Sequence, residues 1–241
     1  MPKKRTLILA IAVFTAITSV MYFYGRSLWV PAYKNFTEKR TVSDIVAAYG
    51  IGARERMRPY FDSAGVSYPP GKIAFLGIKD TARLEVWAET ETGPKFIRSY
   101  SIQALSGTSG PKLREGDKQV PEGLYAIEGL NPNSSYYLSL KLNYPNTFDL
   151  MHAVAEGREN PGTNIFIHGK QVSTGCLAMG DTAIEELFIL AADIGKSNIQ
   201  VAIAPYDPRS SQLSTDLELT WVSELYERLN SHFEQYKRSD S

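Results

Sequence analysis

Short runs of β-branched, aromatic and other apolar residues, separated by turn formers, fill the chain from Gly71 to Ala204, and they constrain the fold more than any other feature of the sequence. Such runs are typical of strands joined by hairpins and short loops. We therefore expect residues 71–205 to form one mainly β domain, with a mainly antiparallel sheet and flanking helices. The expected strands cover residues 73–78, 83–89, 96–102, 123–127, 136–142, 165–167 and 199–204.

The N-terminus has the pattern of an export signal, because the basic residues 3–5 precede an uncharged, mostly apolar run over 6–25. A run of about 18 to 20 such residues crosses the roughly 30 Å hydrocarbon layer as a helix. The aromatic residues 22–24 suit the membrane interface, and no small-x-small cleavage site precedes them. We expect residues 1–26 to be an uncleaved signal anchor, a transmembrane helix, with the rest of the chain outside the membrane.

Residues 27–70 have helical character, with a start signal at 41–44 and a stop at 69–70 where two prolines follow each other. We interpret this segment as a stalk or as a packing helix.

Two further helices are expected beyond the predicted strand 165–167. Thr182 and Glu185 have the spacing of a capping box, which predicts that a helix begins there and runs to about residue 192. In the segment 206–241, an amphipathic C-terminal helix should bury one face, because apolar residues recur every four positions. They are Leu217, Trp221, Leu225, Leu229 and Phe233.

The charge balance excludes some classes of partner. Twenty-six basic and 26 acidic residues cancel, so nothing in the overall charge calls for a nucleic acid. The three histidines, His152, His168 and His232, have no short-spaced partner that would suggest a metal site. We expect no nucleic-acid partner, no metal and no cofactor.

The chain has a single cysteine, Cys176, which lies eight positions after His168 in a polar, glycine-containing stretch. A thiolate is a strong nucleophile, and a nearby imidazole lowers the thiol pKa and holds the proton for a leaving amine. Gly175 would let the backbone approach a reacting carbonyl, and the N–H groups of Gly175 and Cys176 are then candidate oxyanion donors. On spacing alone, a small buried apolar cysteine remains an alternative.

The stretch from His168 to Cys176 resembles the signature of the L,D-transpeptidase catalytic domain family of YkuD type, a histidine-glycine on a strand followed by Ser/Thr-x-Gly-Cys. The matching residues here are His168, Gly169, Ser173, Gly175 and Cys176. Further blocks resemble the YafK-like branch of the family, and the match extends in order over residues 73–205. These blocks are 110–113, 116–117, 121–125, 144–146 and 176–179.

The resemblance implies a β-sandwich-like catalytic domain in which Cys176 is acylated by a peptidoglycan stem peptide and His168 is the base. It also implies that the Gly169 carbonyl orients the imidazole. Ser173 would line the site and support the loop, with a plain turn residue as the alternative. The other candidates for binding substrate are Thr174, Gly175, Tyr125 and Tyr144, although the two tyrosines also suit core packing.

Two departures from the family pattern bear on the reaction. The loop between histidine and cysteine is short, and Thr174 and Leu177 to Met179 stand where the family often has a histidine and an arginine. The resemblance thus implies either a transpeptidase or a hydrolase, the latter an L,D-carboxypeptidase or an amidase that releases a lipoprotein from diaminopimelate. A non-catalytic envelope scaffold is the third possibility.

The implied location is the periplasmic face of the bacterial inner membrane, or the periplasm if the signal is cleaved.

Overall fold

A computed structural model describes residues 2–34, 39–214 and 219–237 of the chain. The chain forms two compact units, residues 1–40 and 41–241, so the expected stalk or packing segment 27–70 is divided between them.

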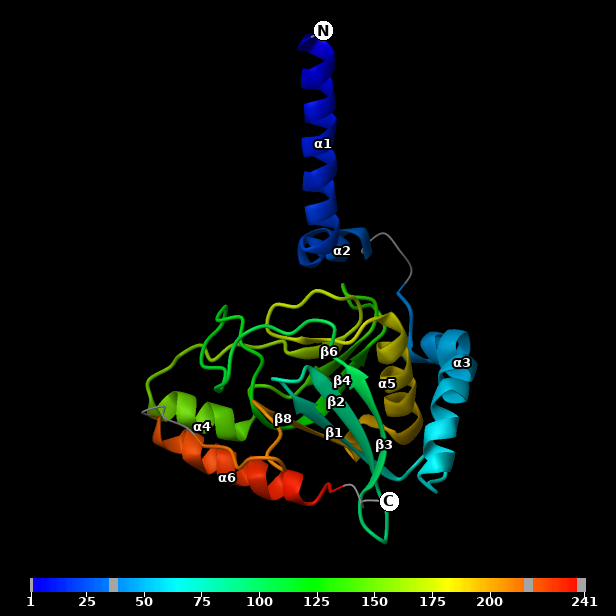
Figure 1. Cartoon of the computed structure of the whole chain (residues 1–241), viewed down its shortest axis with the longest axis vertical. Helices are drawn as coiled ribbons and strands as arrows, with labels where there is room; N and C mark the ends of the chain where they lie inside the picture. Colours follow the sequence, from blue (N-terminus) through cyan, green and yellow to red (C-terminus); the bar gives the residue numbers. More distant parts are fainter. Residues whose placement is uncertain (1, 35–38, 215–218, 238–241) are drawn as a thin grey trace. The chain divides into compact units, whose positions relative to one another are not determined.

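The first unit consists of two helices, α1 (Pro2–Phe23) and α2 (Arg26–Lys34) (Figure 1). Within α1, the 19 residues Arg5–Phe23 are long and apolar enough to cross a membrane, and none of them is buried. The aromatic residues at the end of α1 meet those of α2, since the rings of Tyr22 and Trp29 stack with centroids 5.8 Å apart. The expected apolar N-terminal helix is present, and by its length and composition it is a candidate membrane span or signal sequence.

The second unit is built around one eight-stranded mixed sheet (Figure 1). Its strand order is β3-β2-β1-β8-β4-β5-β6-β7, and all pairs are antiparallel except β1 with β8 and β6 with β7. The mainly β fold with flanking helices is therefore confirmed. The strands are β1 (Lys72–Ile78), β2 (Arg83–Glu89), β3 (Lys95–Ser101), β4 (Gly123–Asn131), β5 (Ser139–Leu142), β6 (Phe166–His168), β7 (Leu177–Ala178) and β8 (Ile199–Ala204).

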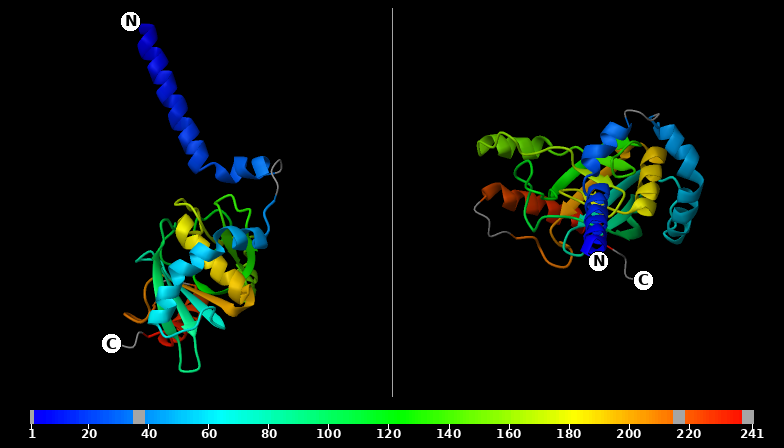
Figure 2. Two further views of the ribbon diagram at one scale, coloured as in Figure 1. Left: turned by 90° about the vertical axis from the view of Figure 1, so that its right-hand side faces the viewer. Right: turned by 90° about the horizontal axis from the view of Figure 1, so that it is seen from above.

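Helices cover both faces of this sheet because alternate strand residues point to opposite sides (Figures 1 and 2). On β1, Ile73 and Phe75 belong to the apolar cluster that contains α3 (Val42–Ser63) and α5 (Asp181–Ile194). Ala74 and Leu76 instead join the cluster that contains α6 (Thr220–Glu234). The remaining helices are α4 (Thr147–Ala155) and the 3-10 turn η1 (Lys196–Asn198).

Helix α3 packs on α5 and begins as the sequence indicates. The Thr41 side chain accepts a hydrogen bond from Asp44 N–H, and the Asp44 carboxylate accepts one from Thr41 N–H. Across the helix pair, the guanidinium of Arg54 binds the carboxylate of Asp193 (2.6 Å). Helix α3 is thus a packing helix rather than a stalk.

The prediction of a capping box at the start of α5 is wrong. The helix begins at Asp181, with Gly180 in the capping position and no side-chain cap. Glu185 does not reach back to Thr182, because its carboxylate binds Arg56 of α3 and the hydroxyl of Tyr137. Tertiary partners therefore outcompete the local cap.

The amphipathic C-terminal helix is confirmed as α6, and it packs on the sheet. The expected apolar stripe is buried at Trp221, Leu225, Leu229 and Phe233. Leu217, the first residue of the expected stripe, lies outside the described residues.

Candidate active site

The parallel pair β6 and β7 places the two candidate catalytic residues at neighbouring strands. Ile167 pairs with Leu177 and His168 with Ala178, so Cys176, which immediately precedes β7, lies beside Phe166. Cys176 and His168 are thus two register positions apart on neighbouring strands. With strands about 4.8 Å apart and a rise of about 3.3 Å per residue, their Cα atoms are separated by roughly 8 Å, within reach of a thiol and an imidazole.

The backbone carbonyl of the next residue, Gly169, holds His168 in one tautomer. Its Nδ1 atom lies 2.6 Å from the carbonyl oxygen of Gly169, as the resemblance implied. A carbonyl oxygen can only accept, so Nδ1 carries the proton and Nε2 keeps its lone pair. The imidazole is 2 % exposed and packs on the ring of Tyr136, with centroids 4.7 Å apart. The side chain is therefore oriented and neutral, which is the form that accepts a proton.

The protonation states of the two side chains follow from burial. Burial lowers the pKa of His168 to about 4, and the Gly169 hydrogen bond raises it only in part. Burial also raises the pKa of the Cys176 thiol to about 11, against the opposing effects of the Phe166 N–H and the Lys112 charge. The expectation that imidazole lowers the thiol pKa is not met, because a neutral imidazole carries no charge to stabilise a thiolate. At neutral pH the pair is a thiol and a neutral imidazole.

The turn before Cys176 is fixed by two serine hydroxyls. The Ser173 hydroxyl accepts from Cys176 N–H (3.0 Å) and donates to the Cys176 carbonyl (2.5 Å), so this residue supports the loop. The Ser106 hydroxyl accepts from Gly175 N–H (2.7 Å) and donates to the Lys118 carbonyl (2.6 Å). Gly175 has φ +94°, a conformation that favours glycine.

These bonds correct the expected oxyanion site. The N–H groups of Gly175 and Cys176 were the candidate oxyanion donors, and each is instead bonded to a serine hydroxyl. An oxyanion could use these two donors only after the hydroxyls of Ser106 and Ser173 turn away. Thr174, which lies between Ser173 and Gly175 in the sequence, is exposed on the turn.

Tyr125 and Tyr144 are core residues and not walls of a groove. They are 3 % and 4 % exposed, and their rings meet edge to face with centroids 6.0 Å apart. Their hydroxyls donate to backbone carbonyls, that of Tyr125 to Glu122 (3.0 Å) and that of Tyr144 to Pro161 (2.8 Å). The expectation that they contact substrate is wrong, because the apolar ring pair buries both side chains.

Two segments distant in sequence form the surroundings of the sulfur. The Sγ atom of Cys176 lies 3.8 Å from the carbonyl oxygen of Asn164. Close by, a Cβ on Gly162 (φ +102°) would lie only 2.7 Å from Cε of Lys112, so the backbone passes directly over the lysine side chain. The ammonium group of Lys112 is bound by Asp117 and by the Arg114 carbonyl (2.8 Å).

Lys112 supplies a positive charge that the sequence interpretation missed. Its block, 110–113, is part of the resemblance, but nothing in the sequence shows that it lies near a cysteine 64 positions later. Ser106 and Tyr136 were also missed, and no local pattern marks them. Among the residues that the structure describes, no group of three or more His, Cys, Asp or Glu side chains could hold a metal ion.

The resting thiol state predicts how Cys176 reacts with iodoacetamide. With a pKa of about 11, roughly one thiol in 10⁴ is ionised at pH 7, so alkylation should be slow. The second-order rate constant should rise about tenfold per pH unit from pH 7 and level off near pH 11. Intact mass against time, at each pH, measures it. A rate that is already maximal at pH 7 would instead indicate a thiolate–imidazolium pair.

Comparison with known proteins identifies the class to which this geometry is related. No family model matches the chain. Two curated proteins, both "Putative L,D-transpeptidase YafK", from Escherichia coli K12 and O157:H7, are each 35 % identical over 133 residues. The alignment spans 53 % of this chain and 52 % of each relative, so the chain matches about half the length of these curated relatives. The resemblance to the L,D-transpeptidase family is thereby confirmed, and within the family it is to the YafK-like branch.

Solved structures give more distant likenesses. The helical cell shape determining protein Pgp2 from Campylobacter jejuni superposes with a TM-score of 0.46 and 15 % identity, over 75 % of this chain and 78 % of that one. L,D-transpeptidase 1 from Mycobacterium tuberculosis gives a TM-score of 0.31 and 12 % identity, over 55 % of this chain and 62 % of that one.

Proposed function

We propose that this chain is a cysteine enzyme that modifies peptidoglycan, and that Cys176 forms an acyl-enzyme with a stem peptide. The observation that carries the proposal is the Nδ1 contact of His168 with the Gly169 carbonyl, on the strand adjacent to the cysteine. This contact leaves Nε2 unprotonated on a side chain that cannot turn away. The similarity to the YafK proteins supports an enzyme of this family.

The reaction begins from the neutral pair. As Sγ attacks the peptide carbonyl carbon, its proton passes to Nε2 of His168, and no buried thiolate has to persist. The C–N bond then breaks, and the imidazolium returns the proton to the leaving amine. A second amine or a water molecule attacks the thioester with His168 again as base, and the thiol is regenerated.

The second step decides between transfer and hydrolysis. An amine acceptor makes the protein an L,D-transpeptidase, whereas water makes it an L,D-carboxypeptidase or an amidase that frees a lipoprotein from diaminopimelate. The helix α1 supports a place at the periplasmic face of the inner membrane, as an anchor, or in the periplasm after cleavage as a signal sequence.

The test is digestion of defined muropeptides by the full chain in nanodiscs. We expect a mass increase on Cys176 equal to the acyl fragment, followed by release of a cross-linked or a hydrolysed product. Free and lipoprotein-linked muropeptides, compared by mass spectrometry, identify the bond that is cut. If no muropeptide and no carbapenem acylates Cys176, the chain is a non-catalytic envelope scaffold.

A further inference from the structure

The C-terminal helix α6 makes a hydrogen bond to a buried carboxylate. The hydroxyl of Tyr226, on α6, donates to Oε2 of Glu122 (2.8 Å). The Glu122 side chain is 0 % exposed, and among the described residues this hydroxyl is the one donor to Oε2. Burial raises the pKa of Tyr226, so the hydroxyl keeps its proton and can donate. Helix α6 therefore satisfies one oxygen of a carboxylate that water does not reach.

The other oxygen of Glu122 holds a loop. Oε1 accepts a hydrogen bond from Gly110 N–H (2.8 Å) and another from the ammonium group of Lys79 (2.7 Å). Lys79 donates in turn to backbone carbonyls at both ends of the loop 108–120. The carboxylate that Tyr226 binds is thus the point at which the loop is fastened.

The same loop contacts the candidate site. The Ser106 hydroxyl joins the Lys118 carbonyl (2.6 Å) to the N–H group of Gly175 (2.7 Å), in the turn before the cysteine. A Cβ on Gly175 would lie 3.5 Å from the carbonyl oxygen of Gln119, so the two backbones are neighbours. Residues 118–122 therefore connect this turn to α6.

We propose that Tyr226 is a positioning residue of the candidate active site, because it fixes through Glu122 the segment that supports the cysteine. Resting on the proposed function, its role is to keep Sγ of Cys176 aligned with His168 for attack on the peptide carbonyl. Without the Tyr226 hydroxyl, Oε2 would be buried with no donor, which is costly enough for the carboxylate to move or to admit water. The segment 118–122 would shift with it, and the thiol would become wetter and less well aligned.

Tyr226→Phe tests this role, since it removes the hydroxyl and keeps the ring. In the full chain in nanodiscs, alkylation of Cys176 by iodoacetamide should level off at a pH about one unit lower than in the parent. At pH 7 it should be about tenfold faster, because a wetter thiol ionises more readily. Acylation by a muropeptide should instead be slower by at least about tenfold, because the thiol and His168 are less well aligned.

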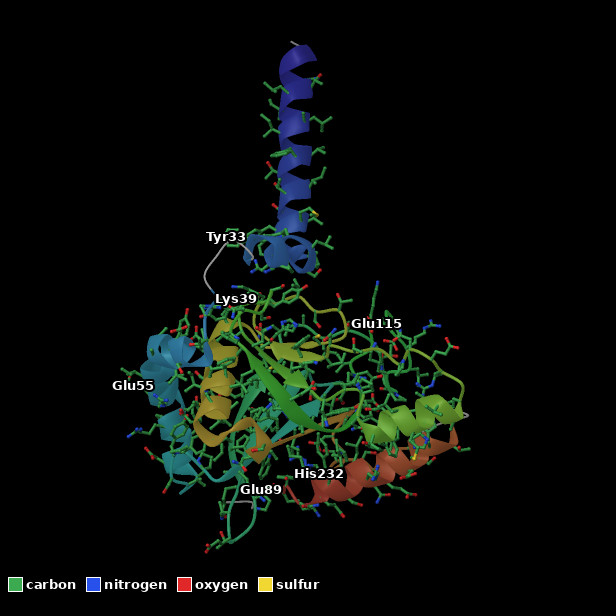
Figure 3. The ribbon with its side chains drawn as sticks, turned by 180° about the vertical axis from the view of Figure 1, so that it is seen from behind. Tyr33, Lys39, Glu55, Glu89, Glu115 and His232 are labelled. Atoms are coloured by element: carbon green, nitrogen blue, oxygen red, sulfur yellow. The ribbon has the colours of Figure 1, made fainter. Side chains whose placement is uncertain are left out.

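Tyr236→Phe is the matched control. Tyr236 lies just after α6, and its hydroxyl also donates to a carboxylate, that of Glu89 (3.3 Å). Figure 3 labels Glu89 well away from Glu115, which belongs to the loop 108–120. The alkylation curve and the acylation rate of this variant should match those of the parent. Equal shifts in both variants would indicate general loosening and would overturn the inference, as would an unchanged curve for Tyr226→Phe.

Ser106→Ala cuts the same connection at its other end. Alone it should shift the alkylation curve in the same direction, and combined with Tyr226→Phe it should shift the curve no further than the larger single change. Additive shifts would mean that the two residues act independently, which would also overturn the inference. Iodoacetamide needs no substrate site, so shifted curves in a chain that no muropeptide acylates would keep the positioning role and reject the proposed function.

Discussion

Cys176→Ala is expected to abolish acylation and product release completely. The thiol supplies the only sulfur nucleophile in the chain, and a methyl group cannot form the thioester. His168→Gln should keep the thiol but lower the acylation rate by about 10² to 10⁴, because the general base is lost. Both rates are measured as the appearance of the mass adduct on the full chain.

The fold should survive these changes, which makes the result interpretable. Cys176 is only half-buried, and the hydrogen bonds of its turn use Ser106, Ser173 and backbone groups. Circular dichroism spectra of Cys176→Ala and the parent should therefore coincide. Residual product release from Cys176→Ala with an unchanged spectrum would assign the chemistry to another residue.

Local patterns were sufficient for most strands: β2 and β8 match the expected ranges, and β1, β3, β4, β5 and β6 differ by one to four residues at their ends. The two-residue strand β7 was not expected. Helix α4 was not expected, although the sequence contains a capping signal for its start. Asn146 accepts from the N–H groups of Phe148 and Asp149, and the Asp149 carboxylate accepts from Asn146 N–H, which is a capping box with Asn and Asp.

The candidate site was predictable only where its residues adjoin in sequence. His168, its Gly169 carbonyl and the Ser173 support of Cys176 lie within nine residues, so motif spacing captured them. Ser106 and Lys112 come from a loop more than 60 residues earlier, and only the folded chain places them at the Cys176 turn. Burial under Tyr136 likewise sets the neutral state of His168, and burial is a tertiary property that spacing does not contain.

Lys79→Met is expected to destabilise the second unit by about 3 to 5 kcal/mol, the usual result of leaving one charge of a buried pair without its partner. The ammonium group of Lys79 lies 2.7 Å from the Glu122 carboxylate, and the two side chains are 5 % and 0 % exposed. It also donates to the carbonyls of Thr108 (2.6 Å) and Val120 (3.2 Å). Burial lowers the pKa of Lys79, and the Glu122 charge opposes this.

The destabilisation should extend to the candidate site. The Lys79 ammonium group binds backbone carbonyls at both ends of the loop 108–120, and the Lys118 carbonyl in this loop accepts a hydrogen bond from the Ser106 hydroxyl. Denaturant unfolding of the full chain measures the stability, and Lys72→Met, at an exposed position of β1, should change it by less than about 0.5 kcal/mol. Lys79→Met combined with Glu122→Leu should cost less than the sum of the single changes, since no unpaired charge is then buried. A purely additive double variant would mean that the two groups do not stabilise each other.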